Sequence, residues 1–75
     1  MNKVRRAILN KIIDQLTDLK DELESVLDDE ETALDNLPES LRESERGENM
    51  QEAVDKMEDA TGSIEDAIDS LNELF

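Results

Sequence analysis

Apolar residues recur along this chain at alternating intervals of three and four positions, the heptad pattern of amphipathic helices that pack together. We label the first residue of each pair a and the second d. In the first half of the chain, these residues are Leu9, Ile12, Leu16, Leu19, Leu23 and Val26. In the second half they are Met50, Ala53, Met57, Ala60, Ile64, Ala67, Leu71 and Leu74. The period predicts two long helices.

Both halves also carry apolar residues one position after d, at position e. These residues are Ile13, Leu27, Leu34, Val54, Ile68 and Phe75. Three apolar positions in seven make a wider stripe than a two-stranded coiled coil needs. The width favours helices that each pack against more than one neighbour.

We therefore predict an all-α fold with helices over about 3–36 and 46–74, joined by a connector over about 37–45. Pro38 should end the first helix, because proline in a helix interior costs roughly 3 kcal/mol. The chain is short enough to form one domain, residues 1–75, with the two helices folded as an antiparallel hairpin.

The connector contains its own helix signals. Ser40 and Glu43 have the spacing of a capping box, which predicts a short helical turn at about 38–44. Leu37 and Leu41 are expected to fill the closed end of the hairpin.

Gly62 interrupts the second helix with a residue that costs about 1 kcal/mol relative to alanine. The heptad phase continues through Gly62, so we predict a continuous helix. The alternative is a break at Gly62, with Ser63 and Asp66 capping a second segment.

Antiparallel folding sets the expected neighbours and leaves part of the stripe uncovered. The expected pairs are Leu34 with Met50, Val26 with Met57, Leu19 with Ile64, Leu16 with Ala67 or Ile68, and Ile12 with Leu71. The alanines of the second helix should then face large residues of the first, and the e residues should remain in water. A homodimer that forms a four-helix bundle would cover them, and a foreign helical partner is the alternative.

Composition narrows the functional classes. The chain has 22 acidic and 8 basic residues, a net charge of −14, and no Cys, His, Trp or Tyr. It has no disulfide, thiolate or imidazole chemistry, and its charge argues against direct binding to nucleic acid. We expect no enzyme activity, no cofactor and no membrane association.

The charge is unevenly distributed. Residues 1–20 have a net charge of +3 and the remainder has −17. In a hairpin the basic segment lies beside Asp69 and Glu73, so charge complementarity is expected to fix the register. A basic amphipathic segment on a membrane surface is the weaker alternative.

Carboxylates are the only plentiful reactive groups. The run Asp28 to Glu31 lacks the alternating ligands and the glycine of a calcium loop, so no metal site is predicted. Glu30 is the one acidic residue in the apolar stripe, and there a polar side chain more often sets register than performs catalysis.

The second helix also presents a face rich in carboxylates. Its members are Glu52, Glu58, Asp59, Glu65, Asp66 and Glu73. Several such faces in a bundle could approach the charge density of duplex DNA, which has one charge per ~1.7 Å of axis. This face is the candidate surface for a basic partner.

The segments Asn36-Leu37-Pro38-Glu39-Ser40-Leu41, Ser44-Glu45-Arg46 and Glu52-Ala53-Val54-Asp55 resemble short acidic helical proteins of phages and prophages of Gram-positive gut bacteria. The resemblance covers most of the chain. It implies a cytoplasmic setting and transfers no functional residue.

The sequence thus predicts a non-enzymatic interaction or assembly module that associates with itself. The alternative is an acidic decoy that mimics DNA and inhibits a basic, DNA-binding host protein.

Overall fold

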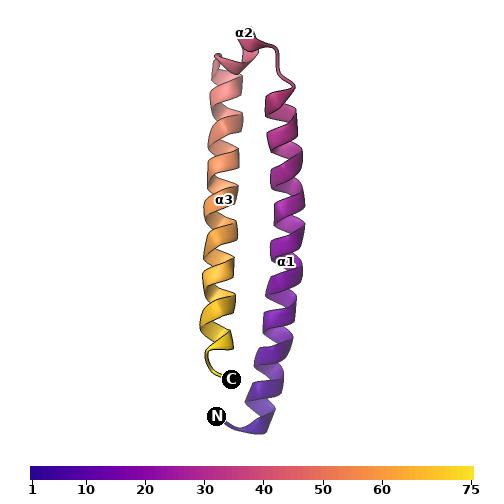
Figure 1. Cartoon of the computed structure of the whole chain (residues 1–75), viewed down its shortest axis with the longest axis vertical. Helices are drawn as coiled ribbons and strands as arrows, with labels where there is room; N and C mark the ends of the chain where they lie inside the picture. Colours follow the sequence, from indigo (N-terminus) through magenta and orange to yellow (C-terminus); the bar gives the residue numbers. More distant parts are fainter.

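The computed structural model describes residues 1–75 and contains three helices and no strand. Helix α1 spans Lys3–Asp35, α2 spans Glu39–Arg42 and α3 spans Glu45–Asn72. The two long helices lie side by side in opposite directions, and α2 sits across their closed end (Figure 1). The predicted all-α hairpin is confirmed, with every long-helix bound within two residues of its predicted position.

Local capping explains where α1 begins and ends. The side chain of Asn2 accepts a hydrogen bond of 2.8 Å from the backbone N–H of Arg5, which satisfies one of the free donors of the first turn. At the other end, Arg42 Nη2 donates to the carbonyl oxygens of Asp35 at 2.7 Å and of Leu37 at 3.3 Å. Arg42 therefore ties α2 to the last turn of α1, a role that the sequence pattern did not predict.

The connector is held together mainly by the backbone. Pro38 precedes the single turn of α2, and its carbonyl accepts from the N–H groups of Leu41 and Arg42. Leu37 is half-buried as expected, whereas Leu41 remains 40% exposed. The prediction that both leucines fill the closed end is therefore wrong for Leu41. Gly47, near the start of α3, is buried against the backbone of Arg42, and this close approach holds α3 against the connector.

Helix α3 runs through Gly62 without interruption. A Cβ built on Gly62 would meet no other atom within 4 Å, so this glycine serves no close packing. The predicted continuous helix is confirmed, and the alternative break at Gly62 is ruled out.

Burial across the hairpin decreases from the e positions to the a positions to the d positions. The e positions contain all four buried apolar residues, which are Ile13, Leu27, Leu34 and Val54. The a positions from Leu9 to Leu23 and from Met50 to Leu71 are half-buried. The d positions are exposed apart from the half-buried Ala53. The two helices therefore meet along a and e.

This result corrects two predictions. Val26 and Leu19 are 52% and 56% exposed, so they do not pack against Met57 and Ile64 between the helices. Ala60 and Ala67 are also exposed and do not face α1. The d stripe is left in water instead of the e stripe. Rotating each helix by part of a turn exchanges d for e, and the heptad period does not distinguish the two rotations.

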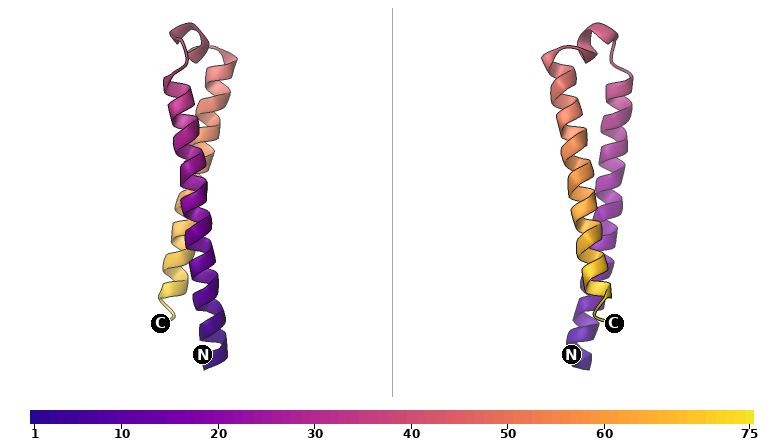
Figure 2. Two further views of the ribbon diagram at one scale, coloured as in Figure 1. Left: turned by 90° about the vertical axis from the view of Figure 1, so that its right-hand side faces the viewer. Right: turned by 60° about the vertical axis from the view of Figure 1, so that its left-hand side comes forward.

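The hairpin is a slender rod with little interior. Its principal extents are 58 × 15 × 12 Å, and its radius of gyration is 17.2 Å, against about 11 Å for a compact domain of this length. The two long helices cross at a shallow angle (Figure 2). No side chain is completely buried. No helix combines the length and apolar character needed to cross a bilayer.

Candidate functional site

The two long helices expose their uncovered stripes on the same side of the rod. Successive side chains turn by about 100° around a helix, which places d and e on opposite sides of a. Because both helices turn their a and e residues toward each other and run antiparallel, their d stripes emerge on one common side. The b and f positions emerge on the opposite side. The hairpin therefore has two distinct faces.

The first, which we call the apolar face, consists of exposed or half-exposed aliphatic side chains from both helices. Its residues are Ile8, Ile12, Leu19 and Val26 of α1, Ala53, Ala60 and Ala67 of α3, and Leu74, which follows α3. The α1 side is built from large side chains and the α3 side mostly from alanine. Together they form an apolar surface along most of the rod, which is unusual for a soluble monomer.

Charges on and beside the apolar face are few and nearly balanced. Arg5, Glu22 and Asp29 of α1 and Arg46 and Lys56 of α3 occupy its d and g positions, and all are exposed. Three of the eight cations of the chain occupy these positions with two of its 22 carboxylates, and two further carboxylates, Glu30 and Glu45, lie at the closed end. The charges on this side nearly cancel, so a second surface meets far less repulsion here than on the acidic face.

A shallow hollow marks the closed end of the apolar face. It is lined by Glu30, Glu45, Arg46, Asn49, Met50 and Ala53. Glu30, the acidic member of the a stripe, is half-buried there. Its place beside Arg46 and Asn49 gives this carboxylate polar surroundings at the edge of the seam.

The second, which we call the acidic face, contains eleven carboxylates at the b and f positions, one of which, Glu65, pairs with Lys20 of α1. Its acidic residues are Asp14, Asp21, Glu24, Asp28, Glu31, Asp35, Glu48, Asp55, Glu58, Glu65 and Asp69. Partial desolvation and contact with Glu58 raise the pKa of the Glu31 carboxyl, and the charges of Asp28 and Asp35 raise it further. Desolvation first, and then the neighbouring carboxyl groups, disfavour ionisation of this member of the acidic face.

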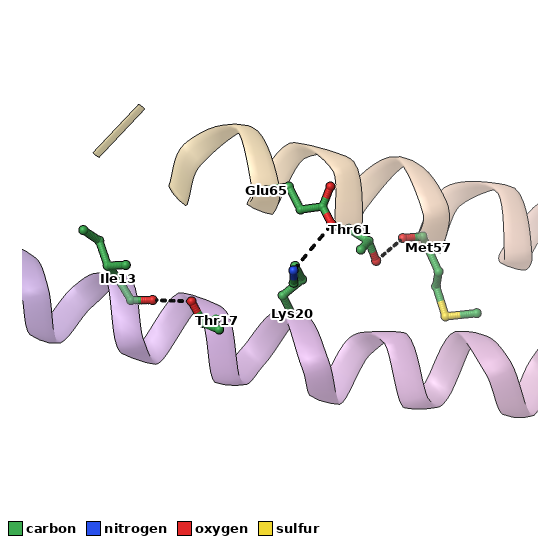
Figure 3. A network of polar contacts seen from close by, with 6 residues as sticks. All are labelled: Ile13, Thr17, Lys20, Met57, Thr61 and Glu65. Atoms are coloured by element: carbon green, nitrogen blue, oxygen red, sulfur yellow. Dashed lines mark hydrogen bonds and ion pairs between the residues drawn. The ribbon is translucent and has the colours of Figure 1, made fainter. Parts of the chain in front are cut away.

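Polar residues between the helices are satisfied locally or across the seam (Figure 3). Lys20 Nζ lies 3.4 Å from Glu65 Oε1, and the Lys20 side chain is 22% exposed. The hydroxyl groups of Thr17 and Thr61 each donate a hydrogen bond of 2.9 Å to the carbonyl oxygen four residues earlier in the same helix. Thr61 is buried in the e stripe, and this bond leaves its hydroxyl satisfied without a partner from α1.

The candidate surface predicted on α3 divides between two sides of the rod. Glu58 and Glu65 lie on the acidic face beside carboxylates of α1. The others point away from α1 along the back of α3 and are exposed: Glu52, Asp59, Asp66 and Glu73. Glu52 pairs with Lys56 at 3.4 Å one helical turn away. The sequence-based prediction did not include the carboxylates that α1 adds to the acidic face. The acidic residues at the b and f positions of α1 were the signal that could have predicted them.

The basic N-terminal segment contributes less to the register than expected. Of its five cations, only Lys20 makes an ion pair with α3, and the partner is Glu65, not Asp69 or Glu73. The expected pairing at the open end of the hairpin is not seen. The one ion pair between the helices lies near the middle of their contact instead.

The structure contains no cluster of acidic side chains arranged to hold a metal ion. No family model matches the chain, and neither the curated proteins nor the solved structures give a significant match. The geometry of the two faces therefore carries the functional argument.

Proposed function

We propose that this chain is a non-enzymatic assembly module that associates with a second copy of itself through the apolar face. The resemblance to phage proteins supports a cytoplasmic setting for this activity. The observation that carries the proposal is the order of burial across the three stripes. The e stripe is the most buried, although Ile68 is half-buried and Phe75 at the open end is exposed, contrary to its predicted place in the core. The a stripe is half-buried, and the d stripe is exposed apart from Ala53.

That order has a simple geometric meaning. In a four-helix bundle the direction toward the bundle axis lies between the a and d positions, while the e positions pack against the neighbour within the hairpin. The isolated hairpin already covers e and half of a. A second hairpin laid on the apolar face would cover d and the remaining side of a. The a and d residues of all four helices would then lie in one core.

Energetics favour the same conclusion. The hairpin exposes 5540 Å², against about 4,700 Å² for a compact monomer of this mass. Each half-exposed leucine or valine that a partner covers contributes on the order of 1 kcal/mol. Small single-core domains are marginally stable, so this additional burial matters to folding as well as to association.

Sedimentation equilibrium of the intact chain and of Leu19→Glu tests the proposal. The intact chain should form a dimer whose population rises with concentration. Leu19→Glu should weaken the dimer by at least about a hundredfold, or about 3 kcal/mol, because it buries an unpaired carboxylate in the apolar face.

Ser25→Glu supplies the matched control, since Ser25 lies on the outer side of α1 and is exposed. This variant introduces the same charge and should dimerise like the intact chain. A helical monomer at every concentration, or equal dimerisation of Leu19→Glu and the intact chain, would contradict the proposal.

We propose as a second candidate that the acidic face occupies the DNA-binding surface of a basic protein. Its segments, residues 14–35 and 48–69, are each about 32 Å long at 1.5 Å per residue. Eleven carboxylates over that length give about one charge per 3 Å, roughly half the linear charge density of duplex DNA. This density is higher than that of α3 alone, which favours the decoy over a merely solvated surface.

Competition with duplex DNA for a purified basic DNA-binding protein tests the decoy. The chain should displace DNA, and added salt should weaken the displacement. A variant with Asp55→Asn, Glu58→Gln and Glu65→Gln should compete poorly. A control with Asp18→Asn, Glu39→Gln and Glu43→Gln has the same net charge and should compete normally. Equal loss in both variants would reduce the effect to net charge and contradict a specific face.

A further inference from the structure

The apolar face also specifies how two copies would be oriented, an inference that rests on the self-association proposed above. Two hairpins can close face to face about a twofold axis in two ways. An axis along the rod puts both connectors at the same end and sets α1 of one copy on α3 of the other. An axis across the rod puts the connectors at opposite ends and sets like helix on like helix. All neighbouring helices are antiparallel in both arrangements, so helix dipoles do not decide between them.

Side-chain size separates the two arrangements. On the apolar face, α1 presents Leu19 and Val26, whereas α3 presents Ala60 and Ala67. Pairing α1 with α3 of the other copy sets large residues against small ones at both contacts, so the helices can keep equal spacing. Pairing like with like sets leucine and valine against each other on one side and alanine against alanine on the other. That arrangement needs a wide spacing between the two α1 helices and a narrow spacing between the two α3 helices.

Charge points to the same choice. Lys20 of α1 lies level with Glu65 of α3, and each step along α1 corresponds to a step back along α3. Asp29 therefore lies level with Lys56. Both side chains are exposed at the g position, on the outer flank of the apolar face, and they point away from each other within one hairpin. When α1 of one copy packs on α3 of the other, Asp29 of each copy lies beside Lys56 of its partner.

We propose that two copies pair about an axis along the rod, with both connectors at the same end and α1 of each copy packed on α3 of the other. The large α1 stripe fills the alanine stripe, and two symmetric Asp29–Lys56 contacts flank the interface. The acidic faces of the two copies then point outward on opposite sides of the bundle.

Distance measurement between spin labels tests the orientation directly. The chain has no native cysteine, so Ser40→Cys in the exposed connector accepts a single label per copy. The proposed dimer should give one label–label distance of about 20–30 Å, set by the spacing of bundled helices and the label arms. Opposite connectors would separate the labels by nearly the 58 Å length of the rod.

Charge exchange provides an independent arm. Lys56→Asp and Asp29→Lys should each weaken dimerisation by about tenfold, because two symmetric attractions become repulsions. The double variant should recover most of the loss. Lys11→Asp changes the charge equally on the outer side of α1, is exposed, and should leave the dimer unchanged.

The outcomes separate the two proposals. A dimer with the long distance, or with a mixture of both distances, overturns the orientation and leaves self-association standing. A dimer in which the double charge variant fails to recover overturns the Asp29–Lys56 contact. A monomer at every concentration overturns the proposed function itself.

Discussion

Lys20 of α1 and Glu65 of α3 form the one ion pair between the helices of this hairpin, with 3.4 Å between Nζ and Oε1. Lys20 occupies an e position between the buried Ile13 and Leu27, so the pair interrupts the most buried stripe of the molecule. A slip of the helices by one heptad would set Lys20 level with Asn72 in one direction and with Glu58 in the other, so the pair opposes only the first slip. The pair therefore favours the observed register over one of its two neighbours, at some cost in apolar contact.

Replacing Lys20 with methionine should stabilise the hairpin by about 1 kcal/mol. A partly exposed ion pair contributes little, whereas a methionine of similar length adds apolar burial to the e stripe. Urea unfolding followed by circular dichroism at one fixed protein concentration measures the change. Lys11→Met on the outer side of α1 is the control and should be neutral. Destabilisation by more than about 1 kcal/mol would mean that the ion pair is stronger than its exposure indicates.

The two glycines should respond in opposite directions to alanine. Gly47→Ala should cost about 1–3 kcal/mol, because the new Cβ would overlap the carbonyl of Arg42 and force the connector to move. Gly62→Ala should stabilise by about 1 kcal/mol, because Gly62 lies in mid-helix and faces open space. Thermal unfolding of both variants provides the comparison. Equal effects at the two sites would contradict the close approach of α3 to Arg42.

Glu31→Gln should stabilise the protein at neutral pH and flatten its pH dependence. Since the pKa of Glu31 is raised in the folded protein, the folded state holds a proton in the range just above the ordinary pKa of a glutamate, where the unfolded chain has released it. Stability from this group falls as pH rises through that window, and the full penalty is present at pH 7. Melting temperatures from pH 4 to 7 measure it.

Asp18→Asn is the matched control for this titration, because Asp18 is exposed on the outer side of α1, away from both faces. It removes one carboxylate, as Glu31→Gln does, and should leave the pH dependence close to that of the intact chain. If Glu31→Gln and Asp18→Asn change the melting curve equally, the effect comes from net charge and not from the contact of Glu31 with Glu58.

The sequence predicted the elements and the approximate register of this fold but not the rotation of its helices. Leu34 was placed beside Met50, and the Lys20–Glu65 pair lies within one or two residues of that register. The period could not show which two of three apolar positions meet inside the hairpin. Lys20 and Thr61 make the e stripe look less apolar, although both lie in the seam. The clue was the d stripe of α3, whose alanines are too small to fill a two-helix interface.

The short connector has a kinetic consequence for any assembly of these chains. The helices meet through residues 36–44, so closing the hairpin costs little loop entropy and its contacts form progressively from the closed end. Helical proteins with such local topology fold in microseconds to milliseconds. Encounter of two copies at micromolar concentration takes about a second at ordinary association rates. Hairpins would therefore close long before they meet, and collision would set the pace of assembly.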